Sequence, residues 1–199
     1  MRGKAFIPVV AAAALLAFAA VAAAAVIRGT NGDDNLVGTP GSDLIYGFGG
    51  NDSIVGNGGT DVMYAGPGND DVTGGDGFDV IYGQAGDDRA RGGDGPDQMY
   101  GNHGSDELRG KQGSDSIRGG PGGDTLYGGP GSDRLDGGRG QDTLWAIAKD
   151  GDTDYLDCGP GDDVAHIREG EKSVVTNCER VIVEPDATTA TSEPGDSSS

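Results

Sequence analysis

Apolar residues recur every nine positions through the middle of the chain, with glycine and aspartate at fixed places between them. From residue 29 to residue 145 the sequence divides into thirteen consecutive nonapeptides without an insertion. Position four is glycine, position six aspartate and position eight apolar in every copy, and position one is glycine except at Ala65. A short repeat of fixed period predicts a solenoid, in which each unit packs against its neighbours.

Positions seven to nine of each copy predict a very short β-strand. Side chains alternate faces along a strand, so position eight points inward and positions seven and nine point outward. One inward apolar side chain per nine residues makes a thin core. Such a core does not offset the ordering of a glycine-rich backbone, at about 1–2 kcal/mol per residue. A further source of stabilisation is therefore expected.

Position nine indicates how the copies stack. Every second copy, at a spacing of 18 residues, carries tyrosine there: Tyr46, Tyr64, Tyr82 and Tyr100. Two copies per turn would place these rings on one sheet as a ladder with rungs about 4.8 Å apart. We interpret the ladder as aromatic residues that stack on one another. Contact with a carbohydrate or a protein partner is the alternative.

The recurring glycine and aspartate columns suggest metal binding. Glycines at positions one and four are expected to take positive φ and to let the backbone pass close to an ion. Aspartate supplies the hard anionic oxygen that Ca²⁺ selects, and backbone carbonyls can complete the coordination shell. The candidate metal ligands are the aspartates of position six: Asp34, Asp43, Asp52, Asp61, Asp70, Asp79, Asp88, Asp97, Asp106, Asp115, Asp124, Asp133 and Asp142.

The consensus GGxGxDxUx, with U apolar, resembles that of the RTX (repeat-in-toxin) family, also called hemolysin-type calcium-binding repeats. The resemblance covers residues 29–145. It implies an all-β, right-handed parallel β-roll with two nonapeptides per turn and Ca²⁺ between loops stacked one turn apart. Thirteen loops then form seven on one edge and six on the other, which gives about eleven full sites between neighbours. Without calcium, a chain of this charge and low apolar content is expected to be disordered.

Residues 1–25 predict a secretory signal peptide, which implies an extracellular protein with no membrane span after cleavage. Arg2 and Lys4 precede an uncharged, alanine-rich run over residues 5–27, and cleavage is expected near Ala25. A transmembrane anchor is the alternative, because the run is long enough to span a bilayer. No Trp or Tyr flanks the run as an interfacial anchor, which favours the signal peptide.

Residues 146–183 predict a cap on the last rung of the solenoid. After a register slip at 146–148, two degenerate copies follow, and residues 173–183 predict one strand or two short ones. Cys158 and Cys178 predict a disulfide, as expected for an exported protein. A redox or metal pair is the alternative, although the spacing matches no CxxC pattern. Residues 184–199, rich in Ser, Thr and acidic residues, are predicted to be disordered.

The remaining composition excludes several function classes. A formal charge of −19 argues against nucleic-acid binding, which needs basic patches. The sequence has no HExxH helix and no GxSxG elbow, and His103 and His166 are isolated in it.

The sequence therefore predicts a non-enzymatic, extracellular calcium-binding protein with a structural, adhesive or calcium-buffering role. Its alternative is an accessory module that assists a separate secreted hydrolase or protease, and an enzyme with an unfamiliar site is a third reading. Calcium ions are the expected ligands. A cell-surface component, a glycan or a secreted enzyme is the expected kind of partner.

Overall fold

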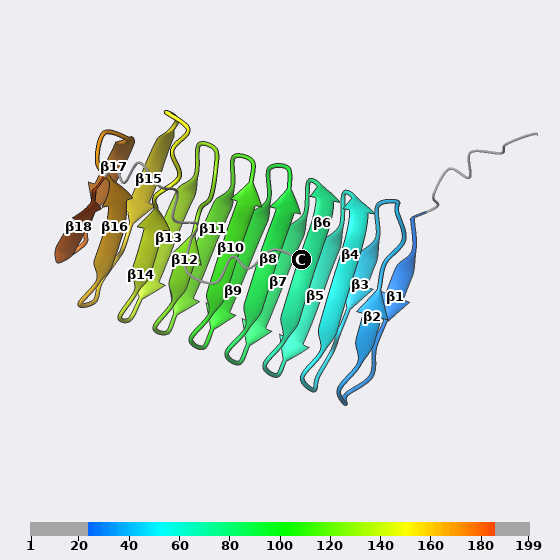
Figure 1. The fold of residues 1–199 in the computed structure, drawn as a ribbon. Helices are drawn as coiled ribbons and strands as arrows, with labels where there is room; N and C mark the ends of the chain where they lie inside the picture. The colour runs from blue at the N-terminus through cyan, green and yellow to red at the C-terminus, as the bar shows by residue number, and fades with distance from the viewer. Residues whose placement is uncertain (1–23, 186–199) are drawn as a thin grey trace, which may run out of the picture.

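A computed structural model describes residues 24–185, which form one elongated stack of β-strands (Figure 1). Nearly all of the expected signal peptide and all but two residues of the expected disordered tail lie outside the described residues. The strands are β1 (Val26–Arg28), β2 (Asn35–Val37), β3 (Leu44–Tyr46), β4 (Ser53–Gly59), β5 (Val62–Pro67), β6 (Asp71–Gly77), β7 (Val80–Ala85), β8 (Arg89–Asp94), β9 (Gln98–His103), β10 (Glu107–Gln112), β11 (Ser116–Pro121), β12 (Thr125–Tyr127), β13 (Arg134–Arg139), β14 (Thr143–Ala146), β15 (Thr153–Asp157), β16 (Val164–Arg168), β17 (Lys172–Thr176) and β18 (Arg180–Glu184). Among the described residues, no helix is long and apolar enough to cross a membrane.

Successive strands alternate between two nine-stranded parallel sheets, with odd-numbered strands in one and even-numbered strands in the other. Residues 18 apart pair across neighbouring rungs, as Ile45 does with Met63 and Tyr46 with Tyr64. The prediction of an all-β parallel β-roll with two nonapeptides per turn is therefore confirmed. Strand β1 lies ahead of the first nonapeptide and pairs with β3, so the stack begins before Gly29.

The core consists mainly of the inward side chains of position eight, as predicted, which the two sheets contribute in turn. These residues are at most 8% exposed, and even the small Ala90 is 2% exposed. They are Leu36, Ile45, Ile54, Met63, Val72, Ile81, Ala90, Met99, Leu108, Ile117, Leu126, Leu135 and Leu144. The strands around them are longer than predicted in the interior of the stack, where β5 and β7 have six residues. Their extra residues belong to the following loop, which also pairs with its neighbour, for example Gly66 with Gln84.

The expectation that position one takes positive φ is wrong. From the third copy onward, positive φ occurs at positions two and four, and position two keeps it even where the residue is Phe48 or Lys111. At position four, crowding requires glycine in addition to the positive φ, because a Cβ on Gly86 would lie 1.7 Å from the carbonyl oxygen of Gly68. At position one, glycine serves close approach and not positive φ, since a Cβ there would contact the aspartate of the same copy; of the thirteen copies, the one that begins with Ala65 alone accommodates a Cβ.

The tyrosine ladder is present on the odd-numbered sheet. Ring centroids of neighbouring tyrosines are 5.2, 4.9 and 4.9 Å apart, and their planes are within 9° of parallel. Because each ring face covers the next, the exposed parts of the ladder are mainly ring edges and hydroxyl groups. The stacking interpretation is therefore confirmed.

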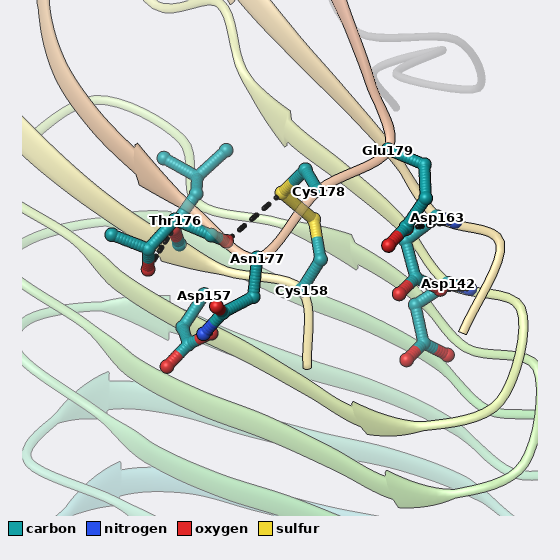
Figure 2. Close-up of a disulfide and its surroundings, with 9 residues drawn as sticks. Asp142, Asp157, Cys158, Asp163, Thr176, Asn177, Cys178 and Glu179 are labelled. Atoms are coloured by element: carbon teal, nitrogen blue, oxygen red, sulfur yellow. Dashed lines mark hydrogen bonds between the residues drawn. A yellow bond between two sulfur atoms is a disulfide. The ribbon is translucent and has the colours of Figure 1, made fainter. Parts of the chain in front are cut away.

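The two degenerate copies continue both sheets instead of leaving them. Strands β15 and β16 pair with β13 and β14, and the last segment forms two strands, β17 and β18. Cys158 and Cys178 form the predicted disulfide, with Cα atoms 5.1 Å apart (Figure 2). The expectation that His166 is isolated is wrong. Its ring stacks on that of Trp145, with the ring centroids 3.6 Å apart, and its Nδ1 lies 2.9 Å from a Glu184 carboxylate oxygen.

Candidate metal sites

The aspartates of position six form two columns, one along each edge of the stack; the first column begins at Asp34 and the second at Asp43. All of them except Asp34 are buried, with exposed fractions of 0–4%. Within a column, one carboxylate oxygen of each aspartate after the first accepts a hydrogen bond from the backbone N–H of the aspartate one rung earlier. In the first column, for example, Asp70 donates to Oδ1 of Asp88 at 2.9 Å. The solenoid thus brings together residues that are 18 positions apart in sequence.

The second oxygen of these carboxylates, Oδ2, is buried and has no hydrogen-bond partner. This holds for Asp52, Asp61, Asp70, Asp79, Asp88, Asp97, Asp106, Asp115, Asp124, Asp133 and Asp142, and also for Asp163. A buried anionic oxygen without a donor costs more than the about 1–3 kcal/mol of a neutral unsatisfied group. Repetition of that cost along both columns is explained if a cation supplies the missing partner.

Backbone oxygens from the next rung face the same space. A Cβ on Gly74 would lie 2.4 Å from Oδ2 of Asp79 and 2.5 Å from the carbonyl oxygen of Gly92. The carboxylate oxygen of one rung and the position-one carbonyl of the following rung therefore converge where glycine leaves room. Oxygen ligands drawn from both carboxylates and carbonyls are those that Ca²⁺ prefers.

The described residues contain no group of three or more His, Cys, Asp or Glu side chains that could hold a metal ion by themselves. This finding and the two columns are compatible, because each rung brings one buried position-six carboxylate to an edge. In such an arrangement carbonyl oxygens must supply much of the coordination. The donor set fits a hard cation and does not fit a site made of His and Cys side chains.

Burial raises the pKa of the position-six aspartates from Asp79 to Asp142 well above the ordinary value of 3.8, to about 6 or higher. Desolvation is the main cause, opposed by the hydrogen bond from the previous aspartate and reinforced by repulsion from neighbouring carboxylates. The pKa is about 7 for Asp88 and Asp97 and about 8 for Asp133. Without a counter-ion, the stack therefore opposes ionisation of these carboxylates at neutral pH.

The first two loops differ from the rest. In both, a threonine at position two turns onto the aspartate of its own copy. Thr30 donates to Oδ2 of Asp34 from its backbone N–H at 2.5 Å and from its hydroxyl at 2.9 Å, and Thr39 N–H donates to Oδ2 of Asp43 at 2.5 Å. Neither threonine takes positive φ. The oxygen that lacks a partner in the interior copies is thus satisfied in these two.

The columns also extend beyond the thirteen copies. Asp133 donates its N–H to Oδ1 of Asp154 at 3.0 Å, and Asp142 donates to Oδ1 of Asp163 at 2.7 Å. The spacing there is 21 residues, because the three inserted residues 146–148 are accommodated at the end of β14 and in the connection to β15 without breaking the stack. The aspartates that remain at position six of the degenerate copies were the available sequence signal for this extension.

The family model of the RTX calcium-binding nonapeptide repeat matches four segments, at residues 28–63, 64–99, 82–117 and 109–144. Together these cover residues 28–144 without a gap, which is more than half of the 199-residue chain. A search of curated proteins finds no match. The matched residues are those that build the glycine loops, the apolar core of position-eight side chains and the aspartate columns. The chain belongs to the RTX calcium-binding nonapeptide repeat family.

Proposed function

We propose that this protein is an exported, non-catalytic β-roll that folds when Ca²⁺ enters its aspartate columns. Outside the cell it would serve as a structural or adhesive element or as a calcium buffer. The observation that carries the proposal is the row of buried Oδ2 atoms without partners, which lie beside carbonyl oxygens of the next rung.

The proposed ligands are the position-six aspartates from Asp52 to Asp142. Each Oδ2, with the position-one carbonyl of the next rung, would hold one ion, which gives about eleven ions. Asp34 and Asp43 were expected to be ligands as well. Because Thr30 and Thr39 occupy their Oδ2 atoms, we propose that these two aspartates close the first rung and bind calcium weakly.

The charge of the chain supports calcium as the folding partner. Loss of Arg2 and Lys4 with a signal peptide takes the formal charge from −19 to −21. Binding of about eleven Ca²⁺ ions adds about +22 and nearly neutralises the chain, so the binding free energy becomes folding free energy. In the metal-free roll, carboxylates on neighbouring rungs would be about 4.8 Å apart and would repel one another.

Native mass spectrometry of the protein from culture medium tests this function. The expected result is about eleven bound Ca²⁺ ions and an N-terminus near residue 26 after signal cleavage. Detection of only one or two ions would contradict the proposed columns. An intact N-terminus on membrane-bound protein would contradict export as a soluble chain.

The alternative, an accessory module for a secreted enzyme, needs a partner-binding surface. The edges and hydroxyls of the tyrosine ladder, together with Gln84 and Asn102 nearby, form the candidate surface. A pull-down from culture supernatant with calcium, followed by chelation, separates the two roles. Release of one hydrolase or protease on chelation would favour the accessory role, and release of no enzyme would favour the independent one.

A further inference from the structure

The first aspartate column is closed at its C-terminal end by a residue outside the repeats. Asp163, in the last degenerate copy, donates its backbone N–H to Oε2 of Glu179 at 2.9 Å. This bond takes the place of the bond from Asp142 N–H to Oδ1 of Asp163 one rung earlier. In Figure 2, Asp142, Asp163 and Glu179 follow one another along the edge of the stack. Glu179 therefore occupies the column position that aspartate has in the preceding rungs.

The glutamate side chain fits the different geometry at this end. Glu179 lies 16 residues after Asp163, whereas residues along the columns are otherwise 18 or 21 apart. The additional CH₂ group gives glutamate a longer reach than aspartate, and its Oε2 accepts the Asp163 N–H across this shorter connection. The sequence pattern could not indicate this residue, because it has neither the spacing nor the residue type of position six.

The carboxylate of Asp163, next to Glu179 in the column, has a buried oxygen without a hydrogen-bond partner, as the interior aspartates do. Asp163 is 0% exposed, and its Oδ2 has no hydrogen-bond partner. Glu179 is exposed, so the space between the two carboxylates opens to solvent.

The disulfide fixes both sides of this space. Cys158 lies in the same degenerate copy as Asp163, and Cys178 immediately precedes Glu179. The turn before Glu179 is held further by Asn177, which takes positive φ and donates from Nδ2 to Asp157 Oδ1 at 2.7 Å (Figure 2). The carboxylates of Asp163 and Glu179 are thus held in neighbouring rungs, where they repel each other, and a bound cation would relieve that repulsion.

We propose that Asp163 and Glu179 hold one further Ca²⁺ ion at the C-terminal end of the first column, outside the thirteen nonapeptides. This inference rests on the proposed function, because it extends the calcium column by one rung. The site is open to solvent, so water completes the coordination shell and the ion is held more weakly than in the interior.

The test is the number of bound ions in the full-length, disulfide-bonded protein and in Glu179→Gln. The glutamine oxygen can still accept the Asp163 N–H, so this change removes the charge and keeps the capping bond. Glu184→Gln is the matched control, because Glu184 is on the adjoining strand β18 and contacts His166 instead of the column. We expect native mass spectrometry in calcium to count one ion fewer in Glu179→Gln and the wild-type number in Glu184→Gln.

Other results would overturn the inference in distinguishable ways. An unchanged ion count and affinity in Glu179→Gln would show that Glu179 binds no calcium while leaving the interior columns intact. If Glu179→Gln lost several ions and also lost β-type circular dichroism, Glu179 would be shown only to stabilise the last rung. A wild-type protein that binds no calcium would overturn the proposed function itself.

Discussion

Replacement of Asp88 by asparagine in the middle of the first column should change stability in opposite directions with and without calcium. Burial, followed by repulsion from Asp106 and Asp70, raises the pKa of Asp88 from 3.8 to about 7. At about 1.4 kcal/mol per pKa unit, its ionisation costs the metal-free fold about 4 kcal/mol above pH 7. The asparagine side chain carries no charge and avoids that cost.

The amide also keeps most of the local bonding. Its oxygen can accept the Asp70 N–H that now bonds to Oδ1 of Asp88 at 2.9 Å. Its nitrogen would replace Oδ2, close to the Gly101 carbonyl oxygen, to which it can donate. If part of the amide stays unsatisfied, the penalty is about 1–3 kcal/mol. The net effect expected for the metal-free roll is a gain of about 1–3 kcal/mol.

In calcium the same change should destabilise the roll, because one ion loses its anionic ligand. At a free calcium concentration 100 times the Kd, each site contributes about 2.7 kcal/mol, which is the expected scale of the loss. Asp94→Asn is the control, since Asp94 is exposed and is not among the charges that raise the pKa of Asp88. Its effect should stay within about 0.5 kcal/mol in both conditions.

Circular dichroism at pH 8 measures both effects. Urea unfolding in saturating calcium reports the loaded roll, and folding induced by trimethylamine N-oxide in chelator reports the metal-free roll. Asp88→Asn should need less urea to unfold and less osmolyte to fold. Destabilisation in both conditions would refute the argument that the buried charge opposes folding until calcium arrives.

Three further predictions concern pH, the disulfide and the glycines. Burial raises the pKa of Asp133 to about 8, above its unfolded value, so the metal-free fold binds more protons and should gain β-type circular dichroism as pH falls from about 8 to about 4; a flat signal in chelator would contradict this. Replacing Cys158 and Cys178 by Ser should cost about 3 kcal/mol in urea unfolding while calcium binding persists; equal stability would mean that the bridge contributes nothing. Gly86→Ala should abolish cooperative unfolding because its Cβ would meet a carbonyl at 1.7 Å, whereas Gly151→Ala, with nothing within 4 Å of its Cβ, should cost only about 1 kcal/mol; equal effects would argue against the tight stacking of loops.

The regular part of the fold was predictable because one period governs both the backbone and the side chains. A copy length of nine places residues 18 apart on neighbouring rungs, so the pairing of Tyr46 with Tyr64 and the inward position eight follow from the pattern. The backbone dihedral angles of the loops were harder to predict from the sequence. Positive φ at position two includes Phe48 and Lys111, residues that disfavour it, so the stacking of the loops and not the local residue type determines it.

The ends of the columns were not predictable from the repeat, because there the chain departs from its own period. Thr30 and Thr39 satisfy their aspartates through bonds that exist only when the loop closes on itself. Asp163 retains the residue type of position six, but it lies after an insertion, so the constant period of nine residues does not by itself place it in the column. Glu179 reaches the column only through the turn that the Cys158–Cys178 bridge holds, and no spacing rule points to it.

The central claim is that calcium binding and folding of the β-roll are one event. The most direct measurement is the hydrodynamic radius of the chelated protein during a calcium titration, with circular dichroism recorded on the same samples. Because each site needs a neighbouring rung, the account predicts a steep joint transition to a compact, β-rich state, with magnesium much less effective. A chain that is equally compact and equally β-rich with and without calcium would contradict it.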